Sequence, residues 1–335
     1  MPIGIWPSQR IRRAIAERAI TSKIAVTENQ IQPASLDLRL GDIAYRVPAS
    51  FLPGEHRSVA ERLAMLSTHE LDLSRPTVLE RGCVHIIPLM ERLALPSTVE
   101  ARANPKSSTG RLDIFVRIIA DRACAFDEIP PGYAGPLYAE VVSRSFPVIA
   151  SAGATLAQIR FRARAYNDQI TRTVPVAVDL DPTDKPNGIV GYRARKTSGL
   201  VDLAKPGAHR IADFWDPIVV DPHRREIVLD PEEFYILASH EPVSAGPGEA
   251  AEMIAYDTAL AEARLHQAGY VDPSFHGKLV LEVRAHDVPF LLMHRQKVGT
   301  LVYEKMAETP DTLYGAQLGS NYQGQQLKLS KHFAP

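Results

Sequence analysis

Residues 130–161 read PPGYAGPLYAEVVSRSFPVIASAGATLAQIRF, and residues 272–303 read DPSFHGKLVLEVRAHDVPFLLMHRQKVGTLVY. Aligned without a gap, the two stretches share proline, glycine and glutamate at fixed positions, and an aromatic residue closes each of them. The matched pairs are Pro131 and Pro273, Gly135 and Gly277, Glu140 and Glu282, Pro147 and Pro289, and Phe161 and Tyr303. Because glycine, proline and acidic residues coincide as well as apolar ones, the pattern predicts an internal duplication.

Strands are the expected secondary structure on both sides of this repeat. Upstream, TVLERGCVHIIPL (77–89) mirrors IVLDPEEFYILAS (227–239), and short apolar runs alternate with Pro, Gly, Asn and Asp in both regions. Runs of this length that are rich in β-branched residues are typical of strands. We therefore predict a mainly β protein with one β domain at 1–165 and a second at 216–335. Residues 166–215, where periodicity is weak, would form a linker or arm.

Two segments predict helices. Residues 7–19 begin with Pro-Ser and place apolar residues on one face. In the second domain, residues 248–267 are rich in Ala, Glu and Leu and end before Gly269, a typical helix stop.

The composition is that of an ordinary globular chain of 335 residues, 45% hydrophobic and 23% charged. With a net charge of −1, no global field attracts nucleic acid or a membrane surface, so an anionic ligand needs a local cluster of donors. Cys83 and Cys124 lie far apart, which fits a reducing compartment. Without an apolar leader or a membrane-length stretch, we expect a cytoplasmic protein.

The stretch NPKSSTGR (104–111) gathers a lysine, three hydroxyl side chains, a glycine and an arginine. Such a set is typical of a compact anion receptor, although a polar turn between strands would have the same composition. It is not a Walker A loop, because the GxxxxGK[ST] pattern is absent.

Two further candidate stretches lie near the C-terminus. AGYVDPSFHG (268–277) is followed by Glu282, a carboxylate inside an apolar strand run. Such a group is either solvent-facing, the commoner case, or buried with a shifted pKa. The tail YGAQLGSNYQGQQ (314–326) is either disordered or a flap that closes over a ligand. Zinc is not expected, because neither H-x-E with P-C-x-x-C nor HExxH occurs.

Four stretches together resemble the dCTP deaminase branch of the trimeric dUTPase-like superfamily. They are PASLDLRLG (33–41), KSSTGRL (106–112), AGYVDPSFHG with Leu281 and Glu282, and SNYQGQ (320–325). The resemblance implies two tandem dUTPase-like domains, each a distorted β-barrel or jelly roll (β-clip). It also implies zinc-independent hydrolysis of dCTP to dUTP and ammonia.

The resemblance also implies roles for individual residues. Glu282 would act as general acid/base, Arg111 would pair with it, and Ser107 and Arg111 would position the attacking water. The backbone carbonyl of Ala268 would help to hold that water. The residues that would bind the nucleotide are Lys106, Ser107 and Ser108 at the phosphates, Asp272 at the 3′-hydroxyl, Tyr270 in the nucleoside pocket, and Tyr314, Tyr322 and Gln325 over it. Mg²⁺ would arrive with the triphosphate, without direct protein ligands.

Departures from the family pattern refine this interpretation. Lys106 stands where the family usually has arginine, and Asn321 replaces a tail lysine. The first copy has Pro130 where Asp is expected, whereas the second copy has no Lys-Ser-Ser loop. We therefore expect one site shared between the halves, with Glu140 a structural remnant. The site could form within one self-contained chain or between chains of a homo-oligomer.

Other functions remain open at this point. A dUTP diphosphatase, or an enzyme that both deaminates and cleaves, would also use Asp272. The chain could instead be an inactive nucleotide-binding regulator. The resemblance further suggests dTTP as an inhibitor.

Overall fold

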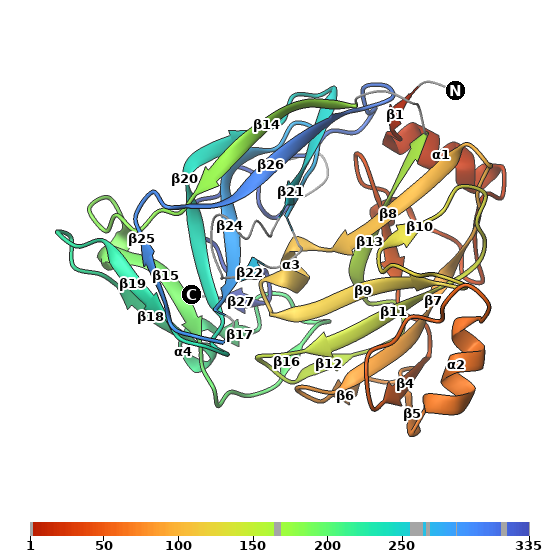
Figure 1. Ribbon diagram of the computed structural model, residues 1–335, viewed down its shortest axis with the longest axis horizontal. Helices are drawn as coiled ribbons and strands as arrows, with labels where there is room; N and C mark the ends of the chain where they lie inside the picture. The colour runs from red at the N-terminus through yellow and green to blue at the C-terminus, as the bar shows by residue number, and fades with distance from the viewer. Residues whose placement is uncertain are drawn as a thin grey trace.

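The computed structural model describes residues 3–163, 169–254, 264–265, 269–285, 287–315 and 320–334, and strands dominate it (Figure 1). In the first half the strands are β1 (Gly4–Ile5), β2 (Ile20–Ser22), β3 (Leu36–Arg39), β4 (Ile43–Val47), β5 (His69–Asp72), β6 (Thr77–Leu79), β7 (Val84–Ala94), β8 (Val99–Pro105), β9 (Ile114–Ala120), β10 (Glu128–Ile129), β11 (Ala134–Ser143), β12 (Val148–Ala150) and β13 (Thr155–Ala163). In the second half they are β14 (Ile170–Ala177), β15 (Ile189–Ala194), β16 (Val201–Asp202), β17 (His209–Arg210), β18 (Trp215–Val219), β19 (Glu226–Leu229), β20 (Tyr235–Ser244), β21 (Glu249–Ile254), β22 (Arg264–Leu265), β23 (Tyr270–Val271), β24 (His276–Arg284), β25 (Phe290–Met293), β26 (Lys297–Lys305) and β27 (Phe333–Ala334). The prediction of a mainly β protein is confirmed.

The helices are few and short. They are α1 (Ser8–Ala16), α2 (Val59–Leu66), α3 (Ser107–Gly110) and α4 (Ile211–Phe214), with 3₁₀ turns at Glu28–Gln30 and Pro186–Gly188. Over the described part of the chain, none is long and apolar enough to span a bilayer.

Each half builds two larger antiparallel sheets. In the first half one sheet has the order β1-β13-β8-β10, with β3 also on β13, and the other has the order β5-β4-β7-β11-β9, with β2 on β7. In the second half the corresponding orders are β14-β26-β21-β23 and β18-β15-β20-β24-β22. The halves lie side by side, and α3 lies between them (Figure 1).

The strand registers of the two halves match residue by residue. Glu140 of β11 lies opposite Ile86 of β7, and Glu282 of β24 lies opposite Ile236 of β20. The irregularity that interrupts β11 between Pro136 and Tyr138 recurs at the matched place in β24, between Lys278 and Val280. The residues that coincide in the sequence repeat therefore also occupy equivalent positions in the sheets.

Residues 169–215, expected to be a linker or arm, differ from that expectation because they form strands. β14 pairs along β26, and β15 pairs with both β18 and β20. β16 pairs in parallel with β12 of the first half. The sequence pattern did not indicate these strands, because most of the first six residues of β14 are exposed and only its last two are buried, which leaves little apolar periodicity.

The two expected helices had different outcomes. The N-terminal one is present as α1, which buries Ile11 and Ala14 and stops before Arg18, whose φ of 62° is incompatible with a continuing helix. The helix expected at 248–267 is wrong for residues 249–254, which form β21. Ala250, Ala251 and Met253 are buried there by pairing with β26, so tertiary pairing outweighs the helix propensity of Ala and Glu. Residues 255–263 and 266–268 lie outside the described part.

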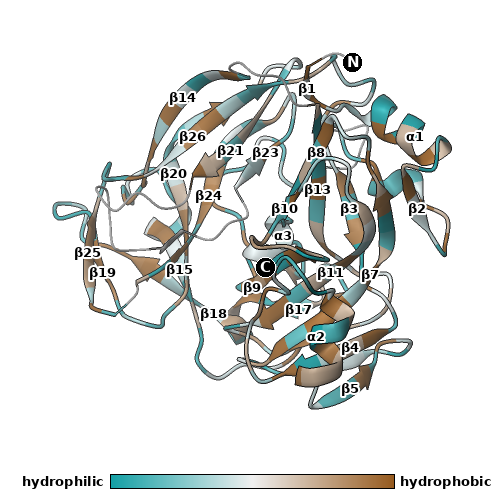
Figure 2. Ribbon diagram, turned by 45° about the vertical axis from the view of Figure 1, so that its right-hand side comes forward, coloured by the Kyte–Doolittle hydropathy of each residue, from teal (hydrophilic) through white to brown (hydrophobic). Residues whose placement is uncertain are grey.

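The hydrophobic core joins the halves. Strands carry most of the hydrophobic stretches (Figure 2). One large cluster contains most of the buried hydrophobic side chains of the first half together with Trp215, Phe234, Ile236 and Phe333 of the second half. Another cluster consists of buried hydrophobic side chains of the second half alone. The centre of the Phe333 ring lies 5.3 Å from the centre of the Phe214 ring and 5.8 Å from that of the Trp215 ring. The end of the chain is thus fixed in the core rather than free.

Candidate active site

A polar cavity of about 260 Å³ opens where α3, the turn between β23 and β24, and the C-terminal tail meet. Side chains from both halves of one chain line it: from the first half Asn29, Gln32, Asp37, Lys106, Ser107, Ser108, Arg111 and Gln158, and from the second Met253, Gly269, Tyr270, Val271, Asp272, Phe275, Leu279, Val280, Glu282, Tyr314, Ser320, Asn321, Tyr322, Gln325 and Lys331. Of the residues predicted for the site, all but Ala268 lie around this cavity. Ala268 lies outside the described residues, next to Gly269.

The Lys-Ser-Ser segment forms one helical turn, α3, at the cavity wall. The Lys106 N–H donates to the carbonyl of Leu156 at 2.9 Å, which fixes the start of this turn to β13. The Lys106 ammonium contacts the carboxylate of Asp37 and donates to Thr155 Oγ1 at 3.2 Å. A cation is therefore held at the cavity by a buried acid of β3.

Asp37 lies in the PASLDLRLG stretch (33–41) and is a cavity residue that the sequence analysis does not predict. It is 3% exposed, and burial raises its pKa against the opposing effect of Lys106. An acidic residue inside the apolar run of β3 was the available signal, because such a group needs a partner.

Asp272 begins the turn between β23 and β24 and lines the cavity. Burial, and then the negative charge of Asp37, raise the pKa of Asp272 to about 7, while the Ala34 N–H favours its ionised form. Its Oδ1 atom is buried and has no hydrogen-bond partner among the described residues. A ligand hydroxyl would satisfy that atom.

Glu282 is buried, so the solvent-facing alternative does not hold. It is 5% exposed, and burial raises its pKa to about 8, although the charge of Arg111 opposes the shift. At the matched position Glu140 is fully buried and accepts a hydrogen bond from Arg117 Nε at 3.0 Å. The two glutamates therefore share a register but not an environment: Glu282 lines the cavity, whereas Glu140 forms an ion pair in its sheet.

Arg111 connects the first half to the tail. Its guanidinium donates to Gln325 Oε1 and to the Lys328 carbonyl, both at 2.9 Å, and lies 3.8 Å from the centre of the Tyr322 ring. Gln325 in turn donates to the carbonyl of Lys278 on β24 at 2.8 Å. The expected pairing with Glu282 takes the form of electrostatic proximity, since each charge shifts the pKa of the other.

Gly277 permits this close approach of the tail. Its φ is 149°, and a Cβ added there would come within 2.9 Å of the Gln325 nitrogen. Only glycine suits both the backbone angle and the contact. The tail over 320–334 is thus docked on the start of β24 and held by β27, which pairs with β17.

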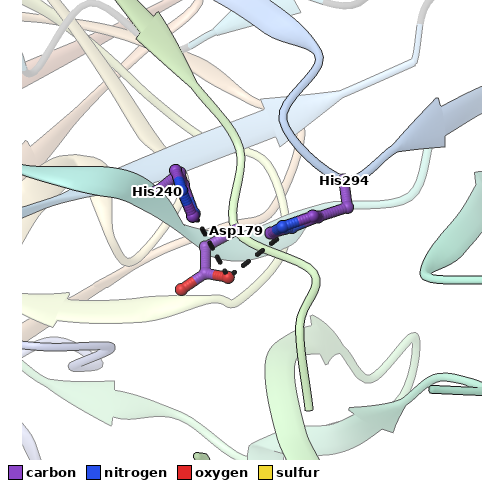
Figure 3. Close-up of side chains that lie close together, drawn as sticks. All are labelled: Asp179, His240 and His294. Carbon is purple, nitrogen blue, oxygen red and sulfur yellow. Dashed lines mark ion pairs between the residues drawn. The ribbon is translucent and has the colours of Figure 1, made fainter. Parts of the chain in front are cut away.

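A second cluster, Asp179, His240 and His294, comes together outside this cavity (Figure 3). Nδ1 of His240 lies 3.9 Å and Nδ1 of His294 lies 3.7 Å from Asp179 Oδ1. The spacing in the sequence gave no sign of this cluster, because its members are far apart along the chain and the fold alone unites them.

Cations already surround the Asp179 cluster. The ammonium groups of Lys185 and Lys278 lie 2.6 and 2.7 Å from Asp179 Oδ2, and Arg295 Nε donates to His240 Nε2 at 3.0 Å. Burial works to raise the pKa of Asp179, but these lysines outweigh it and hold the pKa at about 2. We interpret the cluster as an ion-pair network that fixes the start of β24, since added positive charge would be repelled there.

Comparison with known proteins matches residues 2–333 of the chain to the two domains of one protein family. Residues 2–165 match the model of the 2′-deoxycytidine 5′-triphosphate deaminase N-terminal domain, and residues 139–333 match that of the C-terminal domain. The crystal structure of 2′-deoxycytidine 5′-triphosphate deaminase from Agrobacterium tumefaciens is 45% identical, with a TM-score of 0.88 over 93% of this chain and 100% of that one.

Curated relatives match over shorter segments. A protein from Methanococcus maripaludis named "dCTP deaminase, dUMP-forming" is 42% identical over 66 residues, which cover 19% of this chain and only 32% of the relative. A protein of the same name from Coprothermobacter proteolyticus is 27% identical over 152 residues, 45% of this chain and 77% of the relative.

Proposed function

Because this chain belongs to the 2′-deoxycytidine 5′-triphosphate deaminase family, we propose that it converts dCTP and water to dUTP and ammonia in the cavity between its halves. The observation that carries the proposal is Glu282, a buried carboxyl with a pKa raised to about 8 that shares this cavity with Arg111 and Ser107. A group that titrates near neutral pH can both accept and return a proton.

The proposed reaction needs one proton acceptor and no metal-bound hydroxide. Glu282 takes a proton from water as the oxygen attacks C4 of the cytosine ring. It passes that proton to N3, which leaves a tetrahedral C4 carrying a hydroxyl and the amine. Glu282 then takes the proton of this hydroxyl and gives it to the amine, so that the C4–N bond breaks, ammonia leaves and the C4 carbonyl forms. Ser107 and Arg111 orient the water, and the carbonyl of Ala268 is proposed to help hold it.

The remaining side chains are proposed to orient the nucleotide. Asp272 Oδ1, which has no hydrogen-bond partner among the described residues, accepts a hydrogen bond from the 3′-hydroxyl. Lys106, Ser107 and Ser108 bind phosphates of the magnesium–dCTP complex, and hydroxyl and ammonium donors suit phosphate oxygens. Tyr270, Tyr314, Tyr322 and Gln325 enclose the nucleoside and exclude water. dTTP is proposed to compete for the same cavity.

We further propose that the chain arose by internal duplication of a dUTPase-like β-clip unit and that residues 1–165 and 216–335 descend from the two copies. The matched registers around Glu140 and Glu282 support this origin. After duplication the Lys-Ser-Ser loop was kept in one half, and the turn with Asp272 and the strand with Glu282 were kept in the other. A cavity lined by both halves of one chain favours a self-contained site over one formed between chains.

The experiment is incubation of the purified chain with dCTP and magnesium, followed by chromatographic separation of dCTP, dUTP and dUMP. Formation of dUTP with release of ammonia supports the proposal. Binding of dCTP without turnover would instead indicate a regulatory protein, and absence of both would reject the function.

A second candidate is a bifunctional enzyme that also cleaves dUTP to dUMP and pyrophosphate. Two observations favour it: relatives carry the name "dUMP-forming", and the pKa of Asp272 is raised to about 7, which suits a base for water attack on the α-phosphate. Accumulation of dUMP, and loss of dUMP but not of dUTP in Asp272→Asn, would support this candidate.

A further inference from the structure

Lys331 lies in the same part of the cavity as Lys106, although the two residues are far apart in the sequence. Its side chain lines the cavity that also contains Lys106 and Asp37. The positive charge of Lys331 lowers the pKa of Asp37, and that of Lys106 lowers the pKa of Lys331, so the three groups are neighbours.

The backbone around Lys331 is fixed on both sides. Ser330 Oγ donates to the carbonyl of Ser108 in α3 at 2.8 Å, and the Lys331 N–H donates to the hydroxyl of Tyr322 at 3.2 Å. The Lys331 carbonyl accepts from the Gly207 N–H at 2.9 Å. The end of the chain therefore presents Lys331 beside the Lys-Ser-Ser turn in a set position.

The other tail lysine is engaged elsewhere. Lys328 Nζ donates to the carbonyl of Asn321 at 2.7 Å and stands 5.6 Å from the centre of the Tyr322 ring. Asn321 itself carries no charge. Lys331 is thus the tail cation that lines the cavity.

The Lys331 ammonium has no side-chain partner within the described residues, whereas Lys106 is paired with Asp37. The acids of this part of the cavity are Asp37, which is paired with Lys106, and Asp272, whose pKa burial and the charge of Asp37 raise to about 7. Lys331 is thus left without a paired carboxylate in a half-buried place, and burial together with the charge of Lys106 lowers its pKa. Such an arrangement is unfavourable until an anion enters. A polyphosphate supplies that charge.

We propose that Lys331 and Lys106 together bind the β- and γ-phosphates of the nucleotide, so that the last residues of the chain select a triphosphate over a monophosphate. This inference rests on the proposed function for the identity of the nucleotide. The phosphate site itself can be tested separately.

The kinetic test compares the wild-type chain with Lys331→Gln and Lys331→Arg, using dCTP and dCMP as substrates. Loss of one charge-assisted hydrogen bond raises KM for dCTP roughly ten- to a hundredfold in Lys331→Gln. KM for dCMP and kcat stay nearly constant, and Lys331→Arg recovers most of the affinity. The matched control is Lys297→Gln, which removes an exposed lysine from the start of β26 and leaves both substrates unaffected.

Isothermal titration calorimetry with inorganic tripolyphosphate tests the site without turnover. Wild-type chain and Lys297→Gln bind it alike, whereas Lys331→Gln binds it at least tenfold more weakly. Unchanged tripolyphosphate affinity in Lys331→Gln, or an equal rise of KM for dCTP and dCMP, overturns the inference. If the wild-type chain turns over neither nucleotide but the calorimetric difference persists, the proposed function fails and the phosphate site stands.

Discussion

Glu282 and Glu140 illustrate how the surroundings of one residue decide its chemistry. Both project from equivalent positions of a central strand. Arg117 Nη2 lies 2.5 Å from Glu140 Oε1, and the carboxylate of Glu140 therefore forms an ion pair inside its sheet. Glu282 instead lines a cavity, and burial raises its pKa to about 8. A raised pKa beside an open cavity is typical of catalytic acids and bases.

Glu282→Gln tests this assignment directly. The amide keeps the shape of the side chain but cannot exchange protons, so kcat for dCTP should fall roughly a hundredfold or more while Kd for dCTP changes little. Steady-state kinetics and calorimetric binding measure the two quantities. Glu140→Gln is the matched control, since it makes the same change at the equivalent position. A comparable loss of kcat in both variants would contradict the assignment.

The same substitution makes a prediction about stability and pH. The folded pKa of Glu282, about 8, lies above its ordinary value of 4.5. Between these values the unfolded chain ionises this group while the folded chain keeps it protonated, so its contribution lowers the free energy of unfolding as pH rises. The contribution of Glu282 to the free energy of unfolding is present in full below about pH 4.5, decreases as the pH rises, and stops decreasing near pH 8.

Glu282→Gln removes that dependence. The free energy of unfolding of the variant relative to wild type should increase from about pH 5 to about pH 8, with a slope of at most about 1.4 kcal/mol per pH unit, and then level off. Urea denaturation at several pH values measures it. A difference that stays constant over this range would refute the raised pKa.

At the scale of elements, the C-terminal tail acts as a strap that is fixed at both ends. Just before the tail, Asp311 Oδ2 lies 2.7 Å from Arg12 Nη1 of α1, and at the other end of the tail β27 pairs with β17. Between them Gln325 bonds both to Arg111 of the first half and to the Lys278 carbonyl of the second. The tail therefore joins the two halves around the cavity as well as covering it.

Phe333→Ala tests whether the end of the strap is structural. Phe333 is 9% exposed and packs in the aromatic cluster with Phe214 and Trp215, so its removal should lower the free energy of unfolding by about 3 kcal/mol. Urea denaturation measures the change. Leu291→Ala is the control, because Leu291 is 49% exposed and its loss should cost less than about 0.5 kcal/mol. Equal effects would show that the end of the chain is not anchored.

What the sequence could predict follows from how local each signal is. Strand content and the repeat depend on local patterns, and the side chains at Lys106, Asp272 and Glu282 lie around one cavity as the resemblance implied. The strand Glu249–Ile254 could not be predicted, because pairing with β26 overrides a composition that favours helix. The Asp179 cluster and the position of Lys331 depend on segments brought together only by the fold.

At the scale of the whole molecule, two similar halves perform different tasks. The first half supplies Lys106, Ser107 and Arg111 to the cavity, and the second supplies Asp272 and Glu282. Phe333 and Trp215 of the second half also belong to the core cluster of the first, so the halves are packed as one body. Within the described residues the two halves thus contribute different side chains to one cavity, which supports the proposed single site.

Mixing two inactive variants tests whether this site is complete within one chain. Arg111→Gln removes a cavity residue that the first half supplies, and Glu282→Gln removes one that the second half supplies. Both residues line the same cavity. If each site takes both halves from one chain, every chain in a mixture carries one defect. Co-expression of the variants with two different affinity tags should then give no more dCTP deamination than either variant alone, whatever oligomers form.

If sites formed between chains, a symmetric assembly would contain some interfaces that join an intact Arg111 to an intact Glu282. Recovery of turnover in doubly tagged material would therefore contradict a site within one chain, and its absence in material shown to contain both tags would support it.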